Sequence, residues 1–197
     1  LSISSVLFVG AAYLASERHV GDLHAGAPEL RPEARFNRDI TEITKRYDVT
    51  TDVLVVIAEI LSGIGVNPCR STYTIEAQDN LHWYLENIPG VTKVISLSSV
   101  AKRALSGYAE GNLKWTYLPH NERALAFATS VVDPSTGLLN EACSIMPIYV
   151  FTEDHKATTI SKVIDEIEEY NQNFRNLDDT ITFRYMIQRP SEGTSVI

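Results

Sequence analysis

A pattern of strand, helix and strand that occurs twice along the chain constrains the fold more than any other sequence feature. The second copy begins with residues 144–151, an apolar, β-branched and aromatic segment of strand length that we expect to be buried on both faces. Residues 158–174 carry apolar side chains at helical spacing and acidic side chains on the opposite face, which predicts an amphipathic helix. Residues 181–187 alternate apolar and polar side chains, as a half-buried strand does.

The first copy lies upstream and has the same three parts. Residues 53–57 form a Val, Leu and Ile run of strand length, and residues 91–97 predict a second strand. Between them, a predicted helix that ends at Pro89 and Gly90 has one apolar face: Ala77, Leu81, Tyr84, Leu85 and Ile88. Two such units predict an α+β fold with a ferredoxin-like, split βαβ arrangement: an antiparallel or mixed sheet with the helices packed on one face.

The composition limits the kind of protein and its partners. With 197 residues, 44% of them hydrophobic, the chain is long enough for one domain with its own core. Its formal net charge is -8 and no clustered basic face is visible, since the pair Lys102 and Arg103 is expected on a solvated helix face. Nucleic acids and anionic membrane surfaces are bound through such basic faces. The sequence therefore argues against nucleic acid as a partner and against polybasic membrane binding.

The chain divides into expected segments along its length. They are an apolar start, an entry loop with a short amphipathic helix, the first unit, an insertion of helices and loops, the second unit and a tail: residues 1–15, 16–50, 51–97, 98–143, 144–188 and 191–197. The two units and the insertion form the main domain, residues 51–190. The short helix is predicted from the spacing of Phe36, Ile40, Ile43 and Tyr47.

The apolar start is compatible with three interpretations. Residues 1–15 carry no charge, but they fall short of the roughly 20 residues that span a bilayer. The chain begins with Leu1 and not with Met, so we expect the natural protein to begin earlier. The segment is then the end of a transmembrane helix, the apolar core of a signal peptide, or a buried core element. The first two interpretations place the rest of the chain outside the cytoplasm.

The chain has two cysteines, Cys69 before the first predicted helix and Cys143 at the start of the central strand. If they pair, the crosslink would constrain the unfolded chain by roughly 4 kcal/mol and would need an oxidising compartment. The alternative is two unpaired, buried thiols in a cytosolic protein. The Cys and His spacings typical of zinc sites are missing from the sequence, so we expect no metal on these cysteines.

The insertion is where we expect recognition, because long structured connections carry function while the sheet carries stability. A helix is predicted over residues 98–107, capped by Ser98 or Ser99, and further helical turns are predicted over residues 122–128. Between them lies a segment that forms either a contact surface for a substrate or a lid over the core: Trp115, Tyr117 and Leu118.

The remaining polar side chains show no enzymatic pattern. Asp22 and His24, with Glu29, suit a metal or an acid–base group, but an ordinary capped loop explains them as well. Asp154 and His155 are positioned like an active-site pair, yet Asp154 is also favoured as a helix cap. The sequence contains no nucleophile elbow, no HExxH motif and no phosphate loop. We therefore expect no enzyme activity, no catalytic residue, no metal and no cofactor.

Several stretches closely resemble one protein family. They are GDLHAGAPELRPEARFNRD, NIPGVTKVISLSSVAKRALSGYAEGNLKW, STGLLN and CSIMPIYVFTEDHKATTI, followed by Phe183 and Arg184. These stretches are similar to the large extracytoplasmic loop of resistance-nodulation-division (RND) exporters of the MMPL-like branch, and the likeness covers residues 20–184. After Arg184 the family continues into a Gly-, Ala- and Asn-rich stretch toward the next membrane helix, whereas this chain continues as YMIQRPSEGTSVI.

The resemblance implies a porter domain on the periplasmic side of the inner (cytoplasmic) membrane. Residues 1–15 would then end a transmembrane helix, and Cys69 and Cys143 stand at positions that look like the family's paired cysteines. The expected partners are a hydrophobic or lipid-like small molecule, the membrane domain that couples export to protons, and a possible second copy of the chain. The candidate substrate-cleft residues are Asp22, His24, Trp115, Tyr117 and Leu118.

A free-standing periplasmic ligand-binding or sensor domain of ferredoxin-like fold is the alternative. In the natural gene, hydrophobic spans of about 20 residues on both sides would favour the exporter. A basic start and a stop codon soon after Ile197 would favour the sensor.

Overall fold

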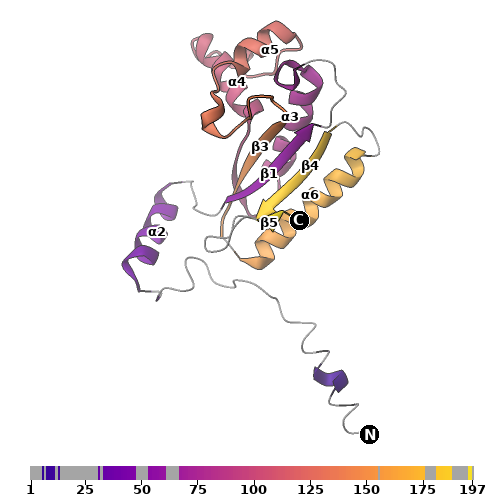
Figure 1. The fold of residues 1–197 in the computed structure, drawn as a ribbon. Coiled ribbons are helices and arrows are strands. Elements are labelled where there is room, and N and C mark those ends of the chain that lie inside the picture. Colours follow the sequence, from indigo (N-terminus) through magenta and orange to yellow (C-terminus); the bar gives the residue numbers. More distant parts are fainter. Residues whose placement is uncertain are drawn as a thin grey trace.

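The computed structural model of the chain describes residues 6, 8–11, 13, 31, 33–47, 53–60, 67–154, 156–175, 181–187 and 195–196. A sheet runs through the centre of the described part, with helices packed against it (Figure 1). Its strands are β1 (Val53–Ile60), β2 (Val91–Ile95), β3 (Ile145–Thr152), β4 (Ile181–Ile187) and β5 (Ser195–Val196).

Neighbouring strands run antiparallel, in the spatial order β2-β3-β1-β4-β5. β3 of the second unit thus lies between β1 and β2 of the first, and β1 lies between β3 and β4 (Figure 1). The register places Val56 opposite Ile148 on one side and opposite Tyr185 on the other. The predicted strands are confirmed, and the chain has the α+β class that the sequence predicts.

The helices follow the predicted order. They are α2 (Arg35–Arg46), α3 (Thr72–Glu86), α4 (Leu97–Tyr108), α5 (Glu122–Thr129) and α6 (Ala157–Arg175), with short 3-10 turns at η1 (Pro68–Arg70), η2 (Leu113–Trp115) and η3 (Pro134–Thr136). α3 and α6 lie side by side, because the rings of Tyr84 and Tyr170 have their centroids 5.1 Å apart. Both helices contribute to one buried apolar cluster.

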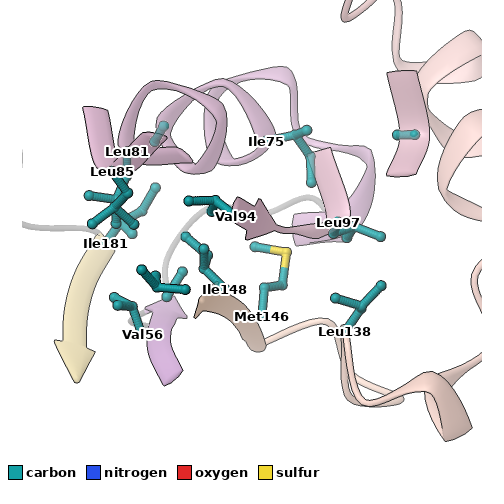
Figure 2. Packing of buried hydrophobic residues seen from close by; sticks show 14 of the residues in the cluster. Val56, Ile75, Leu81, Leu85, Val94, Leu97, Leu138, Met146, Ile148 and Ile181 are labelled. Atoms are coloured by element: carbon teal, nitrogen blue, oxygen red, sulfur yellow. The ribbon is translucent and has the colours of Figure 1, made fainter. Parts of the chain in front are cut away.

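The core lies between the sheet and these helices. Alternate side chains of β1 and β3 point into it, and cross-strand pairs such as Val56 and Ile148 share that face (Figure 2). The expectation that β3 is buried on both faces is wrong, because its side chains alternate between buried and partly exposed and Ile145 is exposed. An antiparallel sheet can keep one face open to solvent, and this one buries a single face in the described part of the chain.

The first unit ends earlier than the sequence predicts. The strand expected over residues 91–97 stops at Ile95, because Ser96 leaves the sheet to become the N-cap of α4. The Ser96 hydroxyl accepts the Ser99 N–H and the Ser99 hydroxyl accepts the Ser96 N–H, which completes a capping box. The predicted cap at Ser98 or Ser99 is therefore wrong by two or three positions.

The N-terminal segments are described only in part. The predicted amphipathic helix of the entry segment is present as α2, and its apolar residues Phe36 and Ile43 are exposed, as is Tyr47 at its C-cap. Most of residues 1–15 lies outside the described residues, so the interpretation of the apolar start stays a prediction. Among the described residues, no helix has the length and apolar character needed to cross a bilayer.

Candidate functional site

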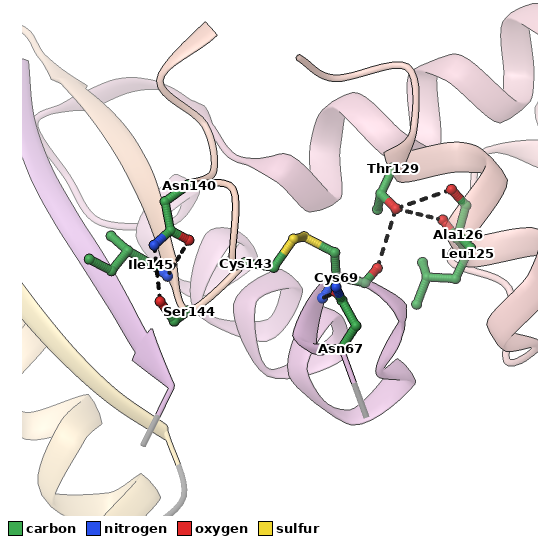
Figure 3. The surroundings of a disulfide bond; sticks show 9 residues. All are labelled: Asn67, Cys69, Leu125, Ala126, Thr129, Asn140, Cys143, Ser144 and Ile145. Carbon is green, nitrogen blue, oxygen red and sulfur yellow. Dashed lines mark hydrogen bonds between the residues drawn. A yellow bond between two sulfur atoms is a disulfide. The ribbon is translucent and has the colours of Figure 1, made fainter. Parts of the chain in front are cut away.

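A disulfide between Cys69 and Cys143 links η1, the turn before α3, to the last residue of the insertion. The two sulfur atoms are 2.07 Å apart and the two Cα atoms are 5.6 Å apart (Figure 3). Cys69 lies in η1 before α3, and Cys143 lies just before β3. Both are buried, and the pairing that the sequence left open is formed.

The chain on each side of the disulfide is held by polar contacts. Cys143 has a positive φ of 56°, and its turn is fixed by Asn140, whose side-chain oxygen accepts the Ile145 N–H at 3.1 Å. On the other side, the Thr129 hydroxyl of α5 donates to the Cys69 carbonyl oxygen at 3.3 Å (Figure 3). The disulfide therefore connects α5, η1 and the first residues of β3.

The predicted contact segment divides into an exposed part and a buried part. Trp115 and Tyr117 are each 49% exposed, and their rings stack with centroids 6.3 Å apart. Leu118 is only 8% exposed and belongs to the core cluster, so it does not share their surface. Leu118 fits the lid interpretation, and the two aromatic residues fit the contact surface. Asp22, His24 and Glu29 lie outside the described residues.

A second pair of exposed aromatic rings escaped the sequence reasoning. Tyr108 at the end of α4 and Phe127 of α5 have ring centroids 4.7 Å apart. The signal was available in α5, where Leu125 and Ala128 form the buried face and leave Phe127 on the outside. The insertion thus presents two exposed aromatic pairs.

A cavity of about 320 Å³ lies between α3 and α4, and the sequence patterns do not predict it. Its walls include Trp83 and Glu86 from α3, Lys102 and Arg103 from α4, and Thr116 after η2. The prediction that Lys102 lies on a solvated helix face is wrong in part, because its ammonium pairs with the Asp79 carboxylate at 2.6 Å and its side chain is partly buried. A sequence alone does not show that α3 supplies this partner.

His82 joins α3 to the start of α4 at the edge of this cavity. Its Nδ1 lies 2.9 Å from the Ser96 hydroxyl and its Nε2 lies 3.2 Å from a Glu86 carboxylate oxygen. Burial lowers the pKa of His82 below the ordinary value of 6.5, although the carboxylates of Glu86 and Asp79 act in the opposite direction. A neutral ring that donates from Nε2 to Glu86 and accepts from Ser96 satisfies both contacts.

Ser96, His82 and Glu86 have the residue types of a Ser–His–carboxylate catalytic triad. The serine hydroxyl, however, is not accessible to a substrate. Ser96 is 0% exposed, and its hydroxyl oxygen already accepts the Ser99 N–H as the cap of α4. A nucleophile has to reach the reacting carbon of its substrate. These contacts therefore anchor two helices to each other.

Asp154 has the structural role that the sequence favoured. Its carboxylate accepts the Lys156 N–H at 3.2 Å and the Thr159 hydroxyl at 2.6 Å, just before α6. Burial on its own would raise the pKa of Asp154, but the hydrogen bonds from Lys156 and Thr159 lower it below the ordinary value. His155 lies outside the described residues, within which no group of three metal-ligating side chains occurs.

Comparisons of the chain with family models, with curated proteins and with solved structures find no match.

Proposed function

We propose that the chain is the periplasmic porter domain of a proton-driven RND exporter of the MMPL-like branch, which passes hydrophobic or lipid-like molecules outward across the inner membrane. The membrane helices of the complete exporter would supply the coupling carboxylates. The domain itself would receive the substrate, and its sheet would hold the receiving surface in place.

The Cys69–Cys143 disulfide is the observation that carries this proposal. The family resemblance implies this pairing, whereas the hydrophobic periodicity and the composition do not determine it. Disulfides persist in oxidising compartments and are rare in the cytosol, so the pairing favours an extracytoplasmic domain. The disulfide supports the rival periplasmic sensor domain equally. The two proposals differ in whether the domain is attached to membrane helices.

We further infer that the sheet is a ferredoxin-like split βαβ arrangement. The order β2-β3-β1-β4 supports this inference, because each strand–helix–strand unit encloses one strand of the other unit. The adjacent positions of α3 and α6 over one buried face support it as well. In this arrangement β5 is an added edge strand.

The stacked rings of Trp115 and Tyr117 are the best candidates for contact with an apolar substrate. Leu113, in the same turn, is 82% exposed and extends the apolar surface. Exposed aromatic and aliphatic side chains that gather on one loop mark interaction sites more often than isolated ones do. This surface lies on the insertion and not on the two strand–helix–strand units that form the sheet.

The exporter proposal predicts that Trp115→Ala in the complete protein lowers export in a whole-cell assay while the amount of membrane-bound protein stays the same. Tyr108→Ala is the matched control, since it removes another exposed aromatic ring of the insertion outside η2. Unchanged export in the Trp115 variant would remove this residue from the site.

The complete reading frame and the cellular fraction decide between exporter and sensor. An exporter domain remains in the membrane fraction after high-salt and carbonate washing, because neighbouring helices anchor it. Recovery of the intact natural protein from the soluble periplasmic fraction would contradict the exporter proposal and support the sensor.

A further inference from the structure

The cavity between α3 and α4 carries charges of both signs on its two helices. Glu86 comes from the last turn of α3 and Arg103 comes from α4, and both line the same space of about 320 Å³. Trp83 precedes Glu86 by three residues on α3, and its indole is 68% exposed. Cavities of roughly 300 to 1,000 Å³ hold small ligands in proteins.

The charges of the walls are available to a ligand to different degrees. The ammonium of Lys102 is compensated by Asp79 at 2.6 Å. Within the described chain, by contrast, Arg103 is paired with no carboxylate. The Glu86 carboxylate contacts His82 Nε2 at 3.2 Å, and the Glu86 side chain is 48% exposed. One cation and one anion therefore remain open to solvent in the same cavity.

A ligand with charge of only one sign fits this cavity poorly. A simple anion drawn to Arg103 would meet the carboxylate of Glu86, and a simple cation drawn to Glu86 would meet Arg103 and Lys102. A molecule that carries both charges satisfies both walls. The exposed indole of Trp83 adds a surface for an ammonium group through a cation–π contact.

We propose that this cavity binds a small zwitterion, with the anionic group at Arg103 and the ammonium group at Glu86 and Trp83. The shared chemistry is an ammonium and an anion a few bonds apart, as in an α-amino acid or in a phosphoethanolamine headgroup. Ser106 and Thr116 place hydroxyl groups in the walls, and the Thr116 hydroxyl already donates to the Leu113 carbonyl oxygen. The proposal concerns the chain itself and does not depend on its role in an exporter.

A headgroup in this cavity would lie next to the aromatic surface described above. Thr116 lines the cavity, and its sequence neighbours Trp115 and Tyr117 form the exposed stack. An acyl chain attached to the headgroup would therefore leave the cavity beside two apolar rings. A free amino acid would occupy the cavity alone.

Titration of the isotope-labelled 197-residue chain, with its disulfide intact, tests the proposal by backbone amide chemical shifts. The probes are O-phosphoethanolamine and glycine as zwitterions, with inorganic phosphate and ethanolamine as their single-charge halves. We expect saturable shifts at α3 and α4 for at least one zwitterion, and binding of the halves weaker by about tenfold or more. Absence of saturable shifts with both zwitterions, or phosphate binding as tight as that of O-phosphoethanolamine, would overturn the proposal.

Two matched pairs of variants locate the binding. Arg103→Gln and Glu86→Gln should each weaken binding of the zwitterion by about tenfold, because each removes one charged contact. Arg123→Gln and Glu141→Gln make the same charge changes at exposed positions outside the cavity and should leave binding unchanged. Equal weakening by variants and controls would mean that long-range charge, not this cavity, attracts the probe, and the proposal would fall. Unchanged amide spectra away from each substitution verify that the variants are folded.

Discussion

α3 and α6 occupy equivalent positions in the two strand–helix–strand units, but their surroundings differ. α3 lies between the sheet and the insertion, and its buried residues include three polar ones, Thr74, Gln78 and His82. α6 buries Val163 and Ile167 and turns an acidic face to solvent. The contrast teaches that an insertion can cover a second face of a helix without changing the sheet. The Ser96 hydroxyl then contacts His82 Nδ1, and the Ser98 backbone N–H donates to the Gln78 side-chain oxygen.

Removing the disulfide should cause the largest loss of stability, and it should affect the insertion more than α6. Because the bridge closes a loop with a sequence separation of 74, Cys69→Ser combined with Cys143→Ser should lower the free energy of unfolding by about 4.5 kcal/mol. Chemical denaturation under oxidising conditions measures the loss. Hydrogen exchange should rise first in α5 and η1 and later in α6, and the opposite order would contradict the view that the bridge secures the insertion.

Truncating one buried isoleucine to alanine on each helix should give the next largest loss of stability. Ile75 of α3 and Ile167 of α6 are both 0% exposed. We expect Ile75→Ala to cost about 4 kcal/mol and Ile167→Ala about 2.5 kcal/mol, because a helix that packs against both the sheet and the insertion relaxes less into the new cavity. Denaturation midpoints with unchanged slopes give both values. Equal losses would show that the insertion adds no rigidity around α3.

The contact between the two helices should give a smaller effect. The Tyr84 hydroxyl donates to the Glu166 carboxylate at 2.5 Å, and this hydrogen bond raises the pKa of Tyr84 to about 12. Tyr84→Phe should cost about 1 kcal/mol near neutral pH. Since the unfolded phenol ionises near pH 10, the wild type should lose stability as the pH rises from 10 toward 12, and the variant should lose less. Parallel profiles for the two proteins would contradict a shared α3–α6 hydrogen bond.

The smallest expected effect comes from His82. Burial lowers the pKa of His82 in the folded chain below the ordinary value of 6.5, so the unfolded chain binds a proton first as the pH falls. Stability should therefore decrease as the pH drops below 6.5 toward the pKa of the folded state. His82→Gln should flatten this part of the profile, whereas His120→Gln, at an exposed histidine, should leave it in place. A wild-type profile that is flat over this range would contradict the neutral, buried ring.

Hydrophobic periodicity predicts the helices and strands of both units well, because the core face of each element repeats at its own period. It fails where one residue serves two elements, as Ser96 does when it ends β2 and caps α4. Periodicity also does not predict the environment of Lys102 beside the cavity. Its partner Asp79 belongs to another helix, and periodicity within one helix does not show which helix packs against it. Of the predicted cleft residues, Trp115 and Tyr117 are exposed and adjacent, which their apolar character alone does not predict.

The interleaved strand order makes the two units interdependent despite their similarity in sequence pattern. β1 has no neighbour from its own unit, since both of its partners, β3 and β4, come from the other half of the chain. A gene cut in two within the insertion would thus not release two autonomous domains. Each half would present unpaired strand edges until it met the other, and one covalent bridge between Cys69 and Cys143 would then hold the reassembled pair together.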